Sequence, residues 1–230
     1  MDNRNKSICI TGASRGLGRA LCAVFLKDSD FTVYAITRNP ESLKGLEEVY
    51  ASRLVVITAD ICSSEGRNLV FSSIATRLDI LIHNAGKLVF KEFQSITEEE
   101  LKSVYNVNVF APFLLTQKLL PLLKESHIIS ISSIGGVEGS LKFAGLSAYS
   151  SSKAALNCLT EMLSEEFKES DNSFNCLALG SVGTEMFESA FSGIEASSTP
   201  EEMARYIFSF AQNAPNVMRG KIISVSRSNP

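Results

Sequence analysis

Tyr149 and Lys153 are the two residues of this chain best suited to transferring a proton to or from a bound ligand. They lie four positions apart in Tyr149-Ser150-Ser151-Ser152-Lys153, so on a helix they share one face. A free tyrosine has a pKa of about 10 and accepts protons poorly at neutral pH. A nearby ammonium stabilises the phenolate and lowers that pKa, which favours general acid–base catalysis. The same spacing also fits an amphipathic helix with a packed tyrosine and a surface lysine.

A glycine-rich turn near the start of the chain has the pattern of a phosphate site. The stretch Thr11-Gly12-Ala13-Ser14-Arg15-Gly16-Leu17-Gly18 follows an apolar run and precedes a helical pattern. A strand, a glycine turn and a helix in this order bind dinucleotide phosphates at the helix N-terminus. Gly12 permits the sharp turn, Gly16 lets the backbone approach a pyrophosphate, and Gly18 leaves room where helix and strand touch.

The same turn has a second interpretation as part of a hydrolase. Gly12-Ala13-Ser14-Arg15-Gly16 matches G-x-S-x-G, the nucleophile elbow of α/β-hydrolases, with Ser14 as nucleophile. That elbow usually follows several strands, whereas this one follows the first. Of the two histidines, we expect His83 to end one strand and His127 to start another. Neither is well suited to act as the base, so a hydrolase is the less favoured alternative.

The end of the second predicted strand carries no acidic residue. Dinucleotide-binding folds that prefer NAD place Asp or Glu there to hold the ribose hydroxyls. This chain has Thr37 and Arg38 at that point, and the glycine turn contributes Arg15. Because arginine binds phosphate in a bidentate fork, these residues favour the 2′-phosphate of NADP(H). The less favoured alternative is that both are solvated surface arginines.

The composition of the chain limits which classes of protein it can belong to. The chain has 230 residues, 45% of them hydrophobic and 20% charged, with a net charge of −3, which predicts neither nucleic acid nor an anionic membrane as partner. The five cysteines are scattered and form no C-x-x-C pair, so we expect reduced thiols in a cytoplasmic protein and no metal site. The early apolar run is too short for a signal peptide, and no later run approaches the roughly 20 apolar residues that span a bilayer.

Apolar strand-like runs alternate with helical patterns, which predicts βαβ units around a parallel sheet. We expect an α/β, Rossmann-like doubly wound, mainly parallel sheet of seven strands with helices on both faces, in one domain over 1–230. The expected strands are 7–10, 31–36, 53–57, 79–83, 127–131, 174–179 and 221–225. The expected helices after the glycine turn are 19–26, 40–50, 65–76, 98–123 with a bend at Pro112, 147–168 and 200–213, and a lid covers about 185–199.

Several further motifs occur in the order typical of one family. Ser133 follows the fifth predicted strand, Asn84-Ala85-Gly86 follows the fourth, and Asn108 lies within a predicted helix. Together with the glycine turn and the Tyr149–Lys153 pair, they make this chain resemble the short-chain dehydrogenase/reductase family, of the classical type. Asp60 and Ile61 match the pair that flanks the adenine in that family, and Gly180 through Thr184 resembles the loop that holds the nicotinamide carboxamide.

The resemblance implies an NADP(H)-dependent oxidoreductase that transfers hydride between the nicotinamide and a carbonyl or alcohol substrate. Tyr149 would exchange the proton, Ser133 would position the substrate oxygen, Lys153 would hold the ribose, and Asn108 would anchor a water. The implied cofactor contacts are Gly12, Ser14, Arg15, Gly16, Leu17, Gly18, Thr37, Arg38, Asp60, Ile61, Asn84, Ala85, Gly86, Tyr149, Lys153, Gly180, Val182 and Thr184.

Some positions depart from the family pattern. His83 stands where asparagine is usual, and Leu179 replaces the proline before Gly180. The gap from Ser133 to Tyr149 is longer than common, the last strand lacks the usual Asp-Gly-Gly ending, and Ser132 is an alternative to Ser133. These differences leave the rim of the active site uncertain. A catalytically silent NADP-binding sensor or scaffold is therefore the second hypothesis, although a scaffold has no need of all four catalytic positions.

The resemblance also implies partners. Family members commonly pair two long helices, so we expect a homodimer or homotetramer through 98–123 and 147–168. We expect the substrate to be a small carbonyl or alcohol. The apolar side chains of the predicted lid and rim suggest an apolar or aromatic one; they are Met186, Phe187, Phe191, Phe143 and Leu146.

Overall fold

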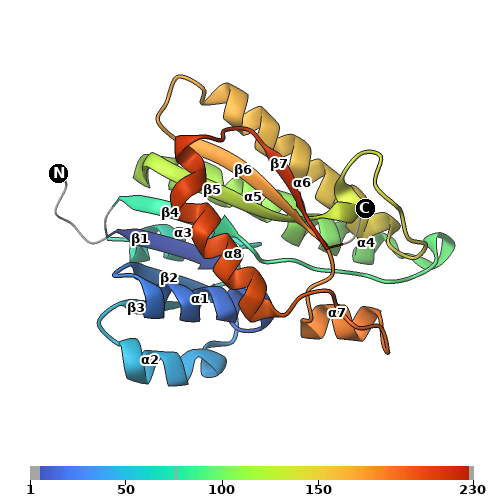
Figure 1. Ribbon diagram of the computed structural model, residues 1–230, viewed down its shortest axis with the longest axis horizontal. Coiled ribbons are helices and arrows are strands. Elements are labelled where there is room, and N and C mark those ends of the chain that lie inside the picture. The colour runs from blue at the N-terminus through green and yellow to red at the C-terminus, as the bar shows by residue number, and fades with distance from the viewer. Residues whose placement is uncertain (1–5, 76, 228–230) are drawn as a thin grey trace.

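The computed structural model describes residues 6–75 and 77–227, and in this part of the chain seven strands form one sheet (Figure 1). The strand order is β3-β2-β1-β4-β5-β6-β7, and each neighbouring pair is parallel. The strands are β1 Ser7–Thr11, β2 Thr32–Thr37, β3 Leu54–Thr58, β4 Leu78–His83, β5 Leu123–Ser133, β6 Ser173–Leu179 and β7 Ile222–Val225. The predicted doubly wound α/β fold is therefore confirmed.

The strand sequences explain why this sheet is parallel and central. Every residue of β1, β4 and β6 is buried, as expected for strands that are covered by helices on both faces. Chain order runs outward in opposite directions from β1 and β4, so the strand order reverses between them. In open α/β sheets a ligand binds at the carboxyl ends of the strands beside such a reversal.

Helices cover both faces of the sheet. Helices α1 (Gly16–Asp28) and α8 (Pro200–Asn213) pack side by side on the face turned to the viewer in Figure 1 and share a core that includes Phe25 and Ile207. Helix α2 (Lys44–Tyr50) follows a 3₁₀ turn at Pro40–Leu43 and packs against the same core. Helices α3 (Ser64–Ser73), α5 (Ala111–Leu119) and α6 (Ser147–Glu166) cover the other face.

The long helix expected over 98–123 is broken in two places. It begins at α4 (Glu98–Tyr105) with the predicted capping box, in which Thr97 and Glu100 each bond the other's backbone N–H. A π-helical segment, Asn106–Phe110, then precedes α5, so the bend expected at Pro112 lies about one turn earlier. The cause is still Pro112, which has no N–H to offer the Asn108 carbonyl, and Ala111 N–H bonds the Asn106 carbonyl instead.

The ends of other elements also differ from the prediction. Leu123 begins β5 rather than ending a helix, because Pro121 has no N–H for the Gln117 carbonyl and α5 closes in a 3₁₀ turn, Leu120–Leu122. Helix α3 ends at Ser73; Thr76, where the predicted helix ended, lies outside the described residues, as do 1–5 and 228–230 of the predicted domain. The expected lid contains a short helix, α7 (Glu185–Ala190).

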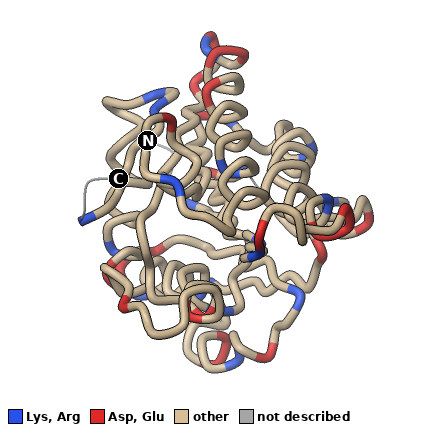
Figure 2. Tube along the Cα trace, turned by 90° about the vertical axis from the view of Figure 1, so that its right-hand side faces the viewer, with Lys and Arg blue, Asp and Glu red and all other residues tan. Residues whose placement is uncertain are grey.

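Charged residues of both signs are interspersed along the trace (Figure 2). Among the described residues, none of the helices is long and apolar enough to cross a bilayer. In the same residues, no group of three or more His, Cys, Asp or Glu side chains is placed to hold a metal ion.

Candidate active site

The glycine turn joins β1 to α1 at the carboxyl edge of the sheet. Gly12 and Gly16 have φ values of 68° and 48°, a left-handed conformation that other residues adopt only with strain. A β-carbon built at Gly18 would lie 2.1 Å from the Gly12 carbonyl oxygen and 2.6 Å from Asn84 Nδ2. All three glycines are therefore required by the shape of the turn itself.

The N-terminus of α1 is left open by this turn. Arg15 occupies the cap position without a side-chain hydrogen bond to the helix, and the first turn of α1 contains no acidic residue. The first N–H groups of a helix have no partner inside it, and they carry the positive end of its dipole. An uncapped terminus of this kind fits the phosphates of a dinucleotide.

Asn84 connects the end of β4 to the glycine turn. Its side-chain amide donates to the carbonyls of Thr11 (2.9 Å) and Gly12 (3.2 Å). The backbone N–H groups of Asn84 and Ala85 both donate to Thr11 Oγ1, each at 3.0 Å. The sequence indicated Asn84 and Ala85 as cofactor contacts; in this structure both shape the turn, and Thr11 is their partner.

Two cations lie beside the presumed adenosine end. Arg15 and Arg38 are exposed, and within the described residues neither guanidinium donates a hydrogen bond or forms an ion pair. The Thr37 hydroxyl is instead used within its own turn, where it donates to the Asn39 carbonyl and accepts from Asn39 N–H. In the turn after β3 a side chain is also bonded within its own turn, because the Asp60 carboxylate accepts from Cys62 N–H. Ile61 in the same turn is buried.

Ser133, Tyr149 and Lys153 come together at the end of β5 and the start of α6. The Ser133 hydroxyl lies beside the Tyr149 phenol and acts to lower its pKa, and Gly135 N–H donates to Ser133 Oγ at 3.2 Å. Ser132 points away from them, since its hydroxyl donates to the Lys153 carbonyl. Lys153 is buried, with Nζ 2.8 Å from the Ile131 carbonyl and 5.7 Å from the centre of the Tyr149 ring.

Burial dominates the electrostatics of this cluster. It raises the pKa of Tyr149 to about 12, although the Ser133 hydroxyl acts in the opposite direction. It lowers the pKa of Lys153 to about 8, because the ammonium loses its hydration. The lowering of the tyrosine pKa expected from the sequence is therefore absent from this cofactor-free structure, in which the ammonium is bonded to a backbone carbonyl.

Asn108 lies fully buried in the π-helical segment and is hydrogen-bonded to the backbone of the segment that follows β4. Its amide donates to the Lys87 carbonyl and to Ser152 Oγ, both at 2.9 Å, and its carbonyl oxygen accepts from Lys87 N–H at 2.8 Å. Gly86 precedes Lys87, and a β-carbon there would lie 3.7 Å from both Lys153 Nζ and Asn108 Oδ1. Asn108, Gly86 and Lys153 therefore form one contiguous group.

The segment after β6 passes across the open end of α1. Gly180 N–H bonds the Val225 carbonyl, and Val182 is buried and forms an isolated parallel bridge with Ser198. Thr184 caps α7 through its hydroxyl, and a β-carbon at Gly16 would lie 3.0 Å from its methyl group. The predicted carboxamide loop and the glycine turn are thus in contact.

The hydrolase interpretation gains no support from the histidines. His83 Nε2 is 2.7 Å from Thr116 Oγ1, and the His127 ring contacts the Ala211 carbonyl and the Asn175 amide. Both rings are buried, and burial lowers the pKa of each to about 4. Neither ring is hydrogen-bonded to Ser14 in the described part of the chain, so the structure contains no Ser14–His pair.

Thr11, Ser152 and Phe90 belong to this edge of the sheet and were not indicated by the sequence. Thr11 is a hydrogen-bond partner of Asn84, and Ser152 is one of Asn108. Both lie directly beside residues of the sequence motifs, and this position is the feature by which the sequence could have revealed them. Phe90 packs its ring against Gly145, four residues before Tyr149. No local pattern marks that contact, because it joins two loops far apart in the sequence.

Comparison with known proteins identifies the family. A family model described as short chain dehydrogenase matches residues 6–195. The chain belongs to this short-chain dehydrogenase family of oxidoreductases. It is similar to the short chain dehydrogenase gsfK of Penicillium aethiopicum, with 32% identity over 94% of this chain and 95% of that protein.

Two further relatives bear on the cofactor. The NADPH-dependent 3-dehydrocapnine reductase of Ornithobacterium rhinotracheale is 32% identical over 80% of this chain and 68% of that protein. A solved structure of a 4-hydroxyisoleucine dehydrogenase mutant complexed with NADH and succinate has a TM-score of 0.86 and 25% identity, covering 96% of this chain and 97% of that one. The family thus includes members described with either dinucleotide.

Proposed function

We propose that this protein is an NADP(H)-dependent carbonyl reductase or alcohol dehydrogenase in which Tyr149 is the general acid and base. One observation carries the proposal: buried Lys153 places its Nζ 5.7 Å from the centre of the Tyr149 ring, and the Ser133 hydroxyl lies beside the phenol. The same edge of the sheet contains the uncapped N-terminus of α1. Segments from along the whole chain contribute residues to the sheet and to the site. We therefore infer that the chain forms one NADP-binding domain.

The bound dinucleotide would supply or accept the hydride, and the residues of this chain would manage the proton and the geometry. Tyr149 holds its proton across the physiological pH range and donates it to the carbonyl oxygen; in the reverse direction it takes the proton back. Ser133 donates a hydrogen bond to the same oxygen and fixes its position. Lys153 exchanges the Ile131 carbonyl for the ribose hydroxyls when a nucleotide binds.

The remaining residues would hold the cofactor. The first N–H groups of α1 would bind the pyrophosphate, and Asp60 and Ile61 would border the adenine. The loop from Gly180 through Thr184, which touches the glycine turn at Gly16, would hold the nicotinamide carboxamide. Asn108 fixes the segment after β4, and a water held by that helix would link Lys153 to solvent.

We infer NADP(H) rather than NAD(H) from the two arginines at the ribose end. Within the described residues the guanidinium groups of Arg15 and Arg38 have no hydrogen-bond or ion-pair partner, and the sequence places no acidic residue directly after β2. Loss of one charge-assisted phosphate contact costs about 1.5–3 kcal/mol, or roughly ten- to a hundredfold in affinity. Titration calorimetry with NADPH and NADH tests this preference; equal affinities would refute it.

A panel of neutral ketones and aldehydes, followed by NADPH absorbance, tests the reaction itself. Turnover of any member supports a reductase. Tight NADPH binding with no turnover across the panel would favour the sensor or scaffold hypothesis.

The five cysteines are free thiols, which leads us to propose that the protein works in a reducing compartment such as the cytoplasm.

A further inference from the structure

Three phenylalanine rings connect the lid to the segment that follows β4. The ring centres of Phe187 and Phe191, on α7 and at its end, are 5.0 Å apart, and those of Phe191 and Phe90 are 5.3 Å apart. These distances are typical of favourable aromatic pairs. We call Phe90, Phe187 and Phe191 the aromatic cluster.

The aromatic cluster also reaches the segment that leads into α6. A β-carbon at Gly145 would lie 2.8 Å from the Phe90 ring, and Lys91 N–H bonds the Gly145 carbonyl at 3.0 Å. Gly145 lies four residues before Tyr149, and Gly86, beside Lys153, lies four residues before Phe90. The cluster therefore joins three segments, 84–97, 134–146 and 185–199, and the second of these leads directly into the helix that carries Tyr149.

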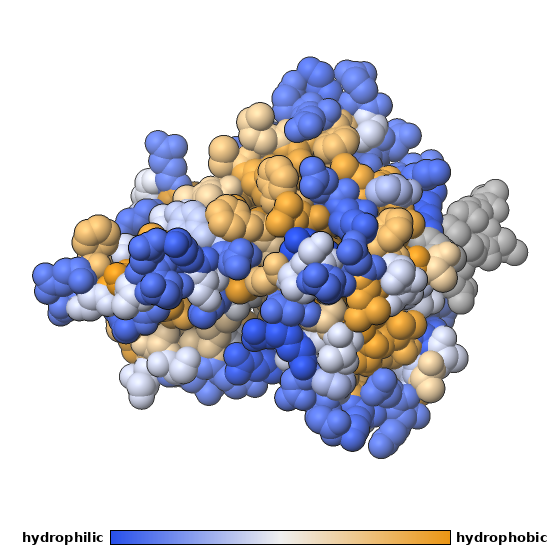
Figure 3. Space-filling view, turned by 180° about the vertical axis from the view of Figure 1, so that it is seen from behind, coloured by the Kyte–Doolittle hydropathy of each residue, from blue (hydrophilic) through white to orange (hydrophobic). Residues whose placement is uncertain are grey.

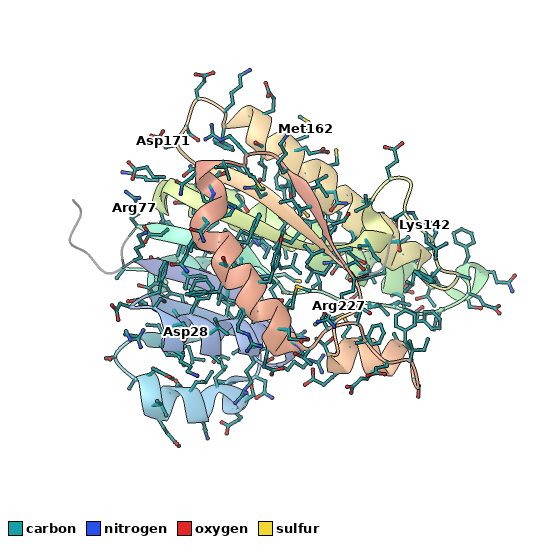
Figure 4. All side chains as sticks on the ribbon, viewed as in Figure 1. Asp28, Arg77, Lys142, Met162, Asp171 and Arg227 are labelled. Carbon is teal, nitrogen blue, oxygen red and sulfur yellow. The ribbon has the colours of Figure 1, made fainter. Side chains whose placement is uncertain are left out.

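These contacts leave much of the apolar surface uncovered. Phe90 remains 48% exposed, and Leu141 and Phe143 on the neighbouring segment are exposed as well. A large ring that is packed on one side and open on the other offers a flat apolar surface to a ligand. Figure 4 shows this end of the molecule around Lys142, beside α4.

Cationic groups around the cluster are scarce and already bonded. No arginine occurs between Arg77 and Arg205 in the sequence. On the bordering segments, Lys87 donates to Ser103, Lys91 pairs with Glu100, and Lys142 donates to the Val137 carbonyl. The lid itself contributes Glu185, Glu188 and Glu195. Together the three segments carry three lysines and five glutamates, so a substrate carboxylate or phosphate would meet net negative charge here.

We propose that Phe90 is a specificity-determining residue that selects uncharged substrates with a flat aromatic group next to the reacting carbonyl. The aromatic group stacks on the exposed part of the Phe90 ring, while the acidic lid disfavours anionic substrates. This inference rests on the proposed reductase function, because it concerns the same site.

Two matched substrate pairs test the inference in the NADPH-loaded protein. Acetophenone and cyclohexyl methyl ketone differ in the flatness of the ring; methyl 4-acetylbenzoate and 4-acetylbenzoate differ in charge. We expect higher kcat/KM for acetophenone and for the ester. In Phe90→Ala the acetophenone-to-cyclohexyl ratio falls about three- to tenfold, as loss of an aromatic contact predicts. Phe90→Leu keeps most of the apolar volume and loses the same preference.

Phe93→Ala is the matched control. Phe93 lies on the same segment, is 83% exposed and makes no ring contact within the described residues, so the ratio should not change. A Phe90→Ala ratio equal to that of the parent, or a parent preference for 4-acetylbenzoate, would overturn the inference.

A binding measurement separates this inference from the proposed function. Saturation-transfer NMR with acetophenone and NADP⁺-loaded protein should show ring signals that Phe90→Ala weakens and Phe93→Ala does not. If those signals occur without turnover of any carbonyl, the reductase function fails and the aromatic site stands. If turnover occurs but the signals do not depend on Phe90, the aromatic site fails and the reductase function stands.

Discussion

At the scale of single residues, the site is built from groups whose charged forms are disfavoured by burial. The phenol of Tyr149 has a pKa raised to about 12, so it keeps its proton throughout the physiological range. The lysine beside it has a pKa lowered to about 8, so it loses its charge within about one pH unit of neutrality. A ligand can therefore change the protonation of Lys153 with little further cost, whereas Tyr149 stays protonated.

Replacement of Tyr149 by phenylalanine tests the role of the phenol. Tyr149→Phe retains the ring and its packing but removes the hydroxyl that lies beside Ser133. General acid–base catalysis contributes about 10²–10⁴-fold, so kcat should fall by that factor. Affinity for NADPH, measured by calorimetry, should change little because the phenol contributes little to nucleotide binding. Reduction of a good substrate at the parental rate would refute the proposed mechanism.

Lys153→Met is the informative contrast, since the ammonium is assigned both to the ribose and to Tyr149. We expect weaker NADPH binding and lower kcat together in this variant. Unchanged NADPH affinity would show that Lys153 does not hold the ribose.

The buried ammonium also predicts how stability depends on pH. The pKa of Lys153 is about 8 in the folded chain, against an unfolded value of 10.5, so the unfolded chain binds more protons between those values. The contribution of Lys153 to the stability of the protein without nucleotide should therefore rise by roughly 2 kcal/mol from pH 7 to 9.5, as the difference from Lys153→Met. Urea unfolding of both proteins in reducing buffer measures the difference; parallel pH curves would contradict it.

At the scale of elements, the glycine turn is the most tightly constrained part of the site. Gly18→Ala would place a methyl group 2.1 Å from the Gly12 carbonyl oxygen, so the turn must shift. We expect a loss of about 1–3 kcal/mol in unfolding free energy, together with loss of NADPH binding. Urea unfolding and calorimetry measure the two effects.

Gly45→Ala is the matched control for that substitution. Gly45 lies within α2, and a β-carbon there would meet nothing within 4 Å. Alanine should raise the unfolding free energy by about 0.5–1 kcal/mol, because glycine is the poorer helix former. Equal effects of the two substitutions would mean that local helix propensity, and not the turn, governs Gly18.

These elements also show how far sequence reasoning reaches. The sheet, the capping box at Thr97 and the helix that bears Tyr149 follow from local patterns of apolar, capping and turn residues. The π-helical segment at Asn108 and the ring contact between Phe90 and Phe191 depend on packing between distant segments. The pKa of Tyr149 was mispredicted for the same reason, because burial is a property of the folded chain.

At the scale of the whole molecule, the face opposite α1 and α8 exposes apolar surface. Figure 3, which views the molecule from behind, shows apolar areas on this face. Large exposed apolar side chains lie on α4, the π-helical segment, α5 and α6: Leu101, Phe110, Phe113 and Met162. Met162 projects outward from α6 in Figure 4. Apolar patches of this kind mark association sites, so we expect two copies to pair through these helices.

Phe113→Glu tests this association. Phe113 is 47% exposed on α5, so a glutamate there can be solvated in a monomer but is costly inside an apolar interface. Light scattering at micromolar concentration should give a dimer for the parent and a monomer for the variant. NADPH affinity should persist, because the glycine turn lies between β1 and α1. The value of kcat should fall, because Asn108 and Tyr149 are carried by the elements that pair.

Val217→Glu is the control for that variant, and it also tests where the interface lies. Val217 is 79% exposed, in the 3₁₀ turn region between α8 and β7, on another part of the surface. If pairing uses α4, α5 and α6, Val217→Glu remains dimeric with parental kcat. Dissociation by Val217→Glu but not by Phe113→Glu would instead assign the contact to the edge of the sheet at β7. A monomeric parent would leave Asn108 and Tyr149 to be positioned by their own helices alone, and the coupling between association and turnover would fail.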